Sequence, residues 1–141
     1  RQGITFGAFD LCHAGHVLMF AECKRNCDYL IVGLQVDPSL ERESKNTPVQ
    51  SLYERHVQLS AIRYIDEIIP YAYEHEIDQI LLSRDINVRF VGDDYVGREF
   101  TGKSTCVDRH IEIQYNNRAH GFSTTELRKR IQINQEFKEK E

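Results

Sequence analysis

Gly7-Ala8-Phe9-Asp10-Leu11-Cys12-His13-Ala14-Gly15-His16 is the stretch that decides the fold. It follows a short apolar run, Ile4 to Gly7, that is typical of a β-strand. It leads into a segment with helical spacing that begins near Ala14 and extends to about Asn26. A strand that passes through a turn directly into a helix is the opening unit of an α/β fold. The rest of the chain is therefore expected to alternate strands with helices.

The two histidines of this stretch lie three residues apart, where the predicted helix begins. Free backbone N–H groups and the positive end of a helix favour phosphate at this place. Imidazole rings can donate hydrogen bonds to phosphate, and Gly15 lets a ligand approach the backbone closely. A packed or solvent-facing histidine pair and a metal site are the alternatives. Because no third ligand is obvious near His13 and His16, we expect no metal site in the protein.

Further apolar or alternating runs predict the remaining β-strands and the helices between them. The strands are Tyr29 to Leu34, Ile68 to Tyr71, Val88 to Gly92 and His110 to Tyr115. The helices run from a capping box at Ser51 to about Tyr64, from about Ile77 to near Arg84, and, after a second capping box at Ser123, from Leu127 to Ile133. This alternation predicts a Rossmann-like α/β fold, with a parallel five-stranded sheet and helices on both faces.

The length and composition suit one globular domain. The chain has 141 residues, of which 40% are hydrophobic and 28% are charged. We expect a domain at 1–133 and a charged, frayed C-terminal tail at 134–141. The polar segment from Asp37 to Gln50 predicts a long surface loop, and loops of this length are often functional.

Net charge, the length of apolar runs and cysteine spacing argue against a nucleic-acid-binding protein, a membrane protein and a thiol redox protein. With 18 Lys and Arg against 22 Asp and Glu, the net charge is −4, so we expect no nucleic-acid partner, although one small anion can still bind locally. No apolar run approaches the ~20 residues of a membrane span, and no secretory signal sequence opens the printed chain, so we expect a cytoplasmic protein without membrane insertion. Cys23 and Cys27 are spaced by four, which is not C-x-x-C, and plain thiols are expected; a thiol redox protein is the minor alternative.

The predicted fold places the binding site before any motif is considered. Parallel α/β sheets bind ligands beyond the carboxyl ends of their strands, at the point where the strand order reverses. The segments expected there are 7–16, 92–94 and the loop before Ser123.

Two ordered motifs resemble those of the cytidylyltransferase family, within the nucleotidylyltransferase superfamily. The opening stretch is similar to the family's His-x-Gly-His motif, and Arg118-Ala119-His120-Gly121-Phe122-Ser123-Thr124-Thr125 is similar to its Arg-Thr-x-Gly-Ile-Ser-Thr-Thr motif. The segments 53–55, 62–67 and 92–94 also match. The resemblance extends from about Ile4 to Ile131 and is greatest to bacterial glycerol-3-phosphate cytidylyltransferases.

The resemblance implies transfer of CMP from CTP to a small phosphorylated acceptor, with release of pyrophosphate. It implies catalytic roles around the triphosphate for His13, His16, Lys45 and Arg118. The nucleotide-binding residues that it implies are Ala8, Phe9, Ala14, Gly15, Arg63, Asp94, Gly121, Phe122, Ser123, Thr124 and Thr125. It further implies a homodimer, and Mg²⁺ that is carried with CTP and touches Asp10 or Asp94.

Some positions depart from the family pattern and leave the substrates open. Ala8 and Ala119 replace threonines, and Phe122 replaces isoleucine. The stretch from Tyr71 to Ile77 offers His75 but no lysine, where the family has a lysine for the acceptor. A phosphorylated polyol, amino alcohol or amide would fit, as a precursor of a surface polysaccharide or a teichoic-acid-like polymer. The alternatives are an adenylyltransferase of the cofactor-synthesis type and a non-catalytic nucleotide-binding module.

Overall fold

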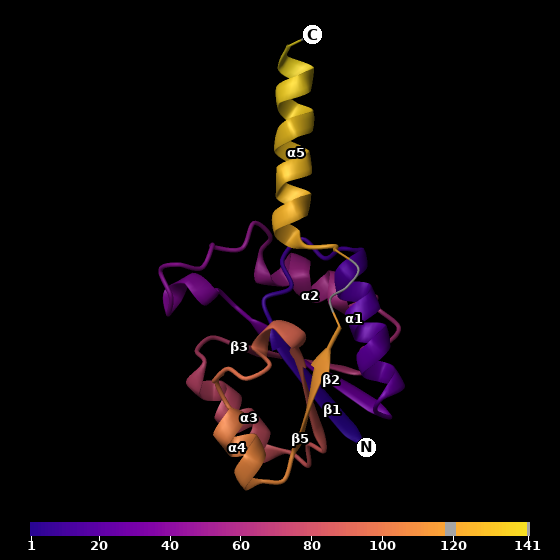
Figure 1. Cartoon of the computed structure of the whole chain (residues 1–141), viewed down its shortest axis with the longest axis vertical. Helices are drawn as coiled ribbons and strands as arrows, with labels where there is room; N and C mark the ends of the chain where they lie inside the picture. The colour runs from indigo at the N-terminus through magenta and orange to yellow at the C-terminus, as the bar shows by residue number, and fades with distance from the viewer. Residues whose placement is uncertain (118–120, 141) are drawn as a thin grey trace.

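A parallel sheet forms the centre of the protein in the computed structural model, which describes residues 1–117 and 121–140 (Figure 1). Within these residues its strands are β1 (Gln2–Gly7), β2 (Tyr29–Gln35), β3 (Glu67–Tyr71), β4 (Val88–Gly92) and β5 (Glu112–Asn116). Their order is β3-β2-β1-β4-β5, and every neighbouring pair is parallel. The predicted α/β sheet of five strands is therefore confirmed.

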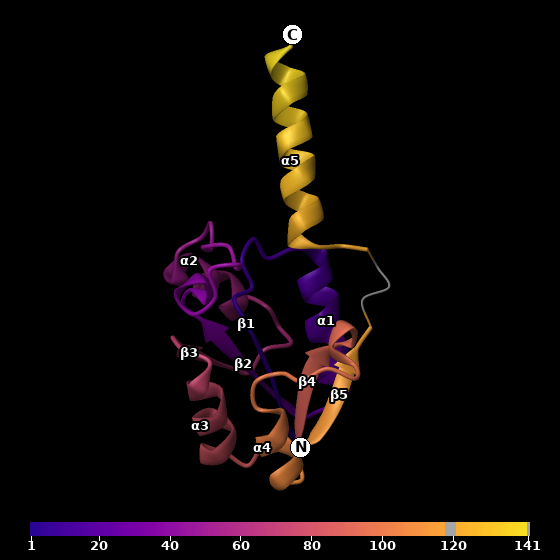
Figure 2. The same ribbon diagram turned by 60° about the vertical axis from the view of Figure 1, so that its left-hand side comes forward.

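Helices cover both faces of this sheet, as Figures 1 and 2 show. The helices are α1 (Ala14–Arg25), α2 (Leu52–Ser60), α3 (His75–Ser83), α4 (Lys103–Asp108) and α5 (Thr124–Glu139), with short 3₁₀ turns η1 (Pro38–Leu40) and η2 (Asp93–Tyr95). Side chains of α1 and α2 pack into one buried cluster and those of α3 and α4 into another. No helix in the described part of the chain is long and apolar enough to cross a membrane.

The alternation of side chains along β2 explains the two buried clusters. Leu30, Val32 and Leu34 are fully buried on the side of α1 and α2, while Ile31 is fully buried on the side of α3 and α4. A central parallel strand must be apolar on both faces because helices cover both. The continuous apolar run of this segment predicted that position correctly.

Several element boundaries differ from the sequence prediction, and one helix was not predicted. Helix α2 ends at Ser60 rather than near Tyr64, because Asp66 must pair with Leu30 beside the start of β2, where N–H···O distances are 2.9 Å and 2.7 Å. Strand β5 begins at Glu112, because His110 has a positive φ of 56° and ends the preceding turn. Helix α4 was not predicted, since six residues with one buried side chain, Cys106, carry no clear period.

Helix α5 extends beyond its predicted end. It continues from Ile133 to Glu139 through residues with high helix propensity, and it contains no buried residue. It projects away from the sheet and its covering helices in both views (Figures 1 and 2). Only its first turns therefore contact the rest of the molecule closely enough to serve the site.

Candidate functional site

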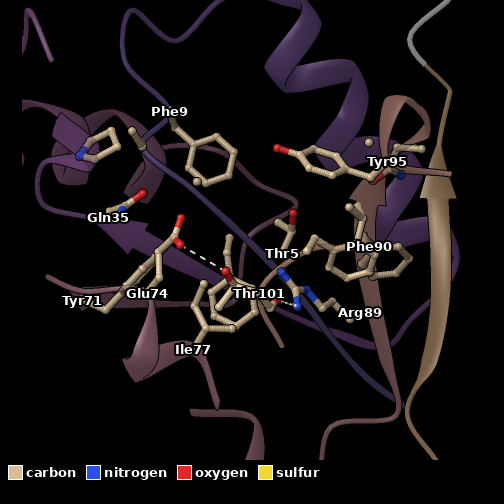
Figure 3. A pocket seen from close by; sticks show the side chains of 18 of the residues that line it. Thr5, Phe9, Gln35, Tyr71, Glu74, Ile77, Arg89, Phe90, Tyr95 and Thr101 are labelled. Carbon is tan, nitrogen blue, oxygen red and sulfur yellow. Dashed lines mark hydrogen bonds between the residues drawn. The ribbon is translucent and has the colours of Figure 1, made fainter. Parts of the chain in front are cut away.

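A cavity of about 430 Å³ opens at the carboxyl edge of the sheet. The strand order reverses between β1 and β4, which places this cavity where open α/β sheets bind ligands. The sequence predicted this edge from the segments 7–16 and 92–94, and both contribute to the wall. Figure 3 shows side chains from several elements around it. The predicted site residues on its wall are Ala8, Phe9 and Lys45.

His13 and His16 cap helix α1 reciprocally. The Nδ1 atom of His13 accepts a hydrogen bond from the Gly15 N–H at 3.0 Å, and the Nδ1 atom of His16 accepts one from the His13 N–H at 3.2 Å. The two ring centroids lie 4.0 Å apart. Because each Nδ1 accepts, the proton of each neutral ring is assigned to Nε2. The pair therefore places two imidazole Nε2 atoms at the positive end of α1.

Phe9 fixes the turn that leads to the histidines. Its φ is 50° and that of Leu11 is 51°, in the left-handed region that bulky residues rarely occupy. Its ring lies edge-on to His16, with centroids 5.7 Å apart, and packs on Phe20 at 5.1 Å. Strain of this kind persists only where the surroundings determine the conformation, which here are the packed rings.

Asp10 joins the turn to two other segments of the chain. Its carboxylate accepts hydrogen bonds from the N–H groups of Val49 and Gln50 at 2.8 Å and 2.9 Å. It also forms an ion pair with Arg128 of α5 at 2.9 Å, and the Asp10 side chain is only 11% exposed. Both oxygens of Asp10 accept hydrogen bonds from the protein, and a contact of Asp10 with substrate-bound Mg²⁺ stays a prediction. Arg128 was not among the predicted site residues, because its contact with Asp10 joins positions far apart in the sequence that no local pattern marks.

Arg55 was noted in the sequence only as part of a matching segment, yet it is 1% exposed and anchors the same turn. Its guanidinium donates to the carbonyl oxygens of Ala8, Gln35, Val36 and Gln50, at 2.5 to 3.2 Å. Burial lowers the pKa of Arg55, while nearby Asp10 raises it. This one side chain connects the end of β2 and the start of α2 to the turn that precedes α1.

The predicted second motif reaches the first through the start of α5. The Ser123 hydroxyl accepts from the Glu126 N–H at 3.0 Å, and the Thr124 hydroxyl donates to the Asp10 carbonyl oxygen at 3.4 Å. The start of α5 therefore contacts Asp10, which lies just before the N-terminus of α1. Gly121 takes a positive φ of 75° just before α5, Phe122 is half exposed, and Thr125 is in the first turn of α5. Arg118 lies outside the described residues, as do Ala119 and His120.

Lys45 reaches the cavity from the long loop that the sequence indicated as functional. Its N–H donates to the Arg42 carbonyl oxygen at 2.9 Å, and both side chains line the wall. Arg42 is engaged by Glu74, with N–O distance 2.9 Å. Ala14 and Gly15 form the first turn of α1, and Gly15 is buried there.

Two predicted residues lie apart from this group. Asp94 is in η2 at the carboxyl end of β4, so it shares the edge, but it is exposed and only its neighbour Tyr95 lines the cavity. Arg63 precedes β3 and therefore lies at the opposite, amino edge of the sheet, where it donates to the Tyr64 hydroxyl at 2.9 Å. Within the described ranges, no cluster of three or more His, Cys, Asp or Glu residues suits a metal ion.

Known proteins share both the sequence pattern and the fold. The family model described as cytidylyltransferase-like matches residues 4–130. A glycerol-3-phosphate cytidylyltransferase from Bacillus subtilis (strain 168) is 34% identical over 132 residues, covering 93% of this chain and 97% of the relative. A bifunctional protein HldE from Nitrobacter hamburgensis is 33% identical over 132 residues, covering 92% of this chain and 27% of the relative.

A solved structure supports the fold alone. The lipopolysaccharide core biosynthesis protein from Thermoplasma volcanium GSS1 has a TM-score of 0.66 at 18% identity, covering 82% of this chain and 98% of that one.

The family model spans most of the chain, and the Bacillus relative exceeds 30% identity over nearly its whole length. The chain therefore belongs to the cytidylyltransferase-like family.

Proposed function

We propose that this protein transfers CMP from CTP to a small phosphorylated acceptor, giving a CDP-linked product and pyrophosphate. The observation that carries the proposal is the meeting of two helix N-termini around Asp10, one of them capped by His13 and His16. A triphosphate needs several N–H donors and positive charge in one place, and helix N-termini supply both.

The protein has little covalent chemistry to perform in this reaction. An oxygen of the acceptor phosphate attacks the α-phosphorus of CTP, the bond from that phosphorus to the bridging oxygen breaks, and pyrophosphate leaves with the electron pair. A phosphate monoester is already an anion near neutral pH, so no strong general base is required. Positioning and stabilisation of negative charge are then the main contributions of the site.

Different residues of the chain bind different parts of the nucleotide. In this proposal the imidazoles of His13 and His16 bind the triphosphate, and Lys45 and Arg118 supply positive charge to it. Ala8 and Phe9 form the wall of the nucleotide pocket. The N–H groups and hydroxyls of Ser123, Thr124 and Thr125 bind phosphate at the start of α5. Mg²⁺ enters as part of the substrate, bound to CTP.

The acceptor that we propose is glycerol 3-phosphate, for precursors of a surface polysaccharide or teichoic-acid-like polymer. Its support is the name of the Bacillus relative, which matches this chain over almost all of both lengths. A homodimer, which the resemblance of the two sequence motifs implies, is a further proposal, and light scattering tests it. Contacts of Arg63 and Asp94 with the nucleotide stay predictions, and Arg63 would have to act away from the histidines of its own chain.

A pyrophosphate-release assay with CTP and Mg²⁺ tests the proposal. The acceptors are glycerol 3-phosphate, phosphocholine, phosphoethanolamine and a set of sugar phosphates. We expect release with glycerol 3-phosphate and formation of the CDP-linked product. If CTP binds but no acceptor gives release, the protein is a non-catalytic nucleotide-binding module. If ATP displaces CTP and supports release, it is an adenylyltransferase.

A further inference from the structure

The cavity contains a buried guanidinium that the triphosphate site does not use. Arg89 is the second residue of β4, between Val88 and Phe90, and it is 6% exposed. Its register partners are Ile4 of β1 and Ile113 of β5, so it lies on the sheet face that α3 and α4 cover. Figure 3 shows the guanidinium on the wall of the cavity, close to Thr101. A charged residue at the centre of a buried strand face requires an explanation.

The surroundings hold this side chain in one orientation. The guanidinium carbon is 4.9 Å from the ring centroid of Phe6 and 4.9 Å from that of Phe100. One terminal nitrogen donates to the Thr101 carbonyl oxygen. At Gly102 a Cβ atom would lie only 2.7 Å from the same nitrogen, and φ there is 86°, so this position suits glycine. These contacts fix the position and orientation of the Arg89 guanidinium.

One carboxylate acts on Arg89 without forming an ion pair with it: Asp78 raises the pKa of Arg89, and its own carboxylate accepts a hydrogen bond from the Thr105 hydroxyl at 2.6 Å. Among residues 1–117 and 121–140, no ion pair joins Arg89 to Asp or Glu, and its Nε atom is buried without a hydrogen-bond partner. Glu74 on the wall is engaged by Arg42 and the Thr101 hydroxyl, and Glu99 lies 3.6 Å from Lys103.

Two other titratable neighbours of Arg89 carry no negative charge. Burial raises the pKa of the Cys106 thiol and of the Tyr71 hydroxyl, so both are neutral near pH 7. Burial lowers the pKa of Arg89 itself, but a guanidinium stays protonated in proteins. A buried charge without an ion-pair partner destabilises the folded protein, and a ligand with a negative charge would offset this cost when it binds.

We propose that Arg89 binds the phosphate of the acceptor and sets the specificity of the cavity for an anionic substrate. This inference rests on the proposed function for the identity of the ligand. A planar guanidinium between two rings presents its N–H groups in one plane, which matches two oxygens of a phosphate group. The stretch from Tyr71 to Ile77, both ends of which line the cavity, contains no lysine or arginine that could take this role.

The decisive variant is Arg89→Met, which removes the charge and keeps a side chain of similar length. We expect the KM for glycerol 3-phosphate to rise about 10- to 100-fold, the range for loss of a hydrogen bond to a charged group. The KM for CTP should change less than about twofold in the same enzyme. The melting temperature should stay level or rise, because an apolar replacement of a buried charge is often neutral or stabilising. The matched control is Arg109→Met, at an exposed position after α4.

A purely structural role for Arg89 gives a different pattern. In that case Arg89→Met lowers the melting temperature and raises the KM of both substrates together, or leaves both unchanged, and either result overturns the inference. Arg89→Lys keeps the charge without the planar donor pair, so we expect a smaller rise in acceptor KM than for Met. Equal KM values for the two variants would also contradict a phosphate site.

Binding without CTP separates this inference from the proposed reaction. Titration calorimetry with inorganic phosphate and with glycerol 3-phosphate should show binding to the wild type and to Arg109→Met but not to Arg89→Met. If the wild type releases no pyrophosphate but phosphate binding depends on Arg89, the reaction is wrong and the anion site holds. If turnover is normal and Arg89→Met keeps its acceptor affinity, only the inference about Arg89 fails.

Discussion

His16 performs two tasks at the scale of a single residue. Its Nδ1 accepts from the His13 N–H, and its Nε2–H is the donor proposed for the triphosphate. His16→Ala removes both, whereas His16→Asn can keep the capping acceptor on a shorter side chain. We expect turnover to fall about 10²- to 10³-fold in both variants, the usual effect of losing one preorganised donor. Pyrophosphate release at saturating CTP and acceptor measures this.

Stability separates the two tasks of His16. Loss of a cap costs about 1 kcal/mol, so urea unfolding should show this loss for His16→Ala and less for His16→Asn. His56→Ala is the matched control, because His56 is exposed on α2 and contacts Ser60. Retained turnover in a folded His16→Ala enzyme would mean that the site lies elsewhere.

We expect Arg55 to contribute more to the free energy of unfolding than a surface arginine does. Arg55→Met leaves the carbonyl oxygens of Ala8, Gln35 and Val36 without their donor in a buried setting. An unsatisfied buried acceptor costs about 1–3 kcal/mol, and water can reach only some of these. We expect the free energy of unfolding in urea to fall by at least about 2 kcal/mol. Arg25→Met, at an exposed position in the last turn of α1, should change it by less than about 0.5 kcal/mol.

At the scale of elements, the segments with strong local chemistry were predicted well from the sequence. The capping box of α2 is present in full, with Ser51 and Glu54 each accepting the other's backbone N–H. Strand β2 was predicted from its continuous apolar run. The ends of α2 and α5 were predicted less well, because a helix can stop or continue through residues of similar propensity and only tertiary contacts decide.

The candidate site combines predicted residues that are adjacent in the sequence with other residues, far apart in the sequence, that no local pattern marks. His13 and His16 share one turn, so their spacing indicated phosphate at a helix N-terminus. Arg55 and Arg89 act on carbonyl oxygens or rings of other segments, and no periodic pattern marks such a contact. An arginine within an apolar strand run, as at Arg89, was the one available indication, and it was not used.

The ion pair between Asp10 and Arg128 fastens α5 to the first motif. The side chain of Asp10 is 11% exposed and that of Arg128 is 33% exposed, so solvent screens the pair only in part. Because no residue of α5 is buried, few other contacts hold the start of this helix. We expect Arg128→Met to raise the KM for CTP about tenfold, which is about 1.4 kcal/mol, with little change in melting temperature.

A double-mutant cycle with Asp10→Asn and Arg128→Met isolates that contact. For residues in contact, we expect the CTP affinities to show a coupling of about 0.5–3 kcal/mol. Lys129→Met, at the next position of α5, serves as the control for removal of one positive charge. Additive effects of the two substitutions on CTP affinity would show that the pair does not couple the helix to the site.

At the scale of the whole molecule, the site depends on a fold with two separate cores. Phe20 and Cys23 belong to the core under α1 and α2, while Ile77 and Cys106 belong to the core under α3 and α4. The strands between them contribute to both cores, so the two layers should unfold together. The cavity lies at the edge of this unit, where the loops carry the functional side chains and the sheet supplies rigidity.

The buried thiol of Cys23 makes this shared stability sensitive to alkaline pH. Burial raises the pKa of Cys23 to about 12 from an ordinary value of 9.0, although Asn116 lowers it through a hydrogen bond. A group whose pKa is raised by folding contributes stability that is complete below the unfolded pKa and is lost as the pH rises toward the folded pKa. We therefore expect the free energy of unfolding to decline between about pH 9 and pH 12. Cys23→Ala should flatten this decline, measured by urea unfolding at successive pH values, while Cys12→Ala, at a less buried thiol, should flatten it less. Equal slopes for the wild type and Cys23→Ala would show that other groups dominate the alkaline limb.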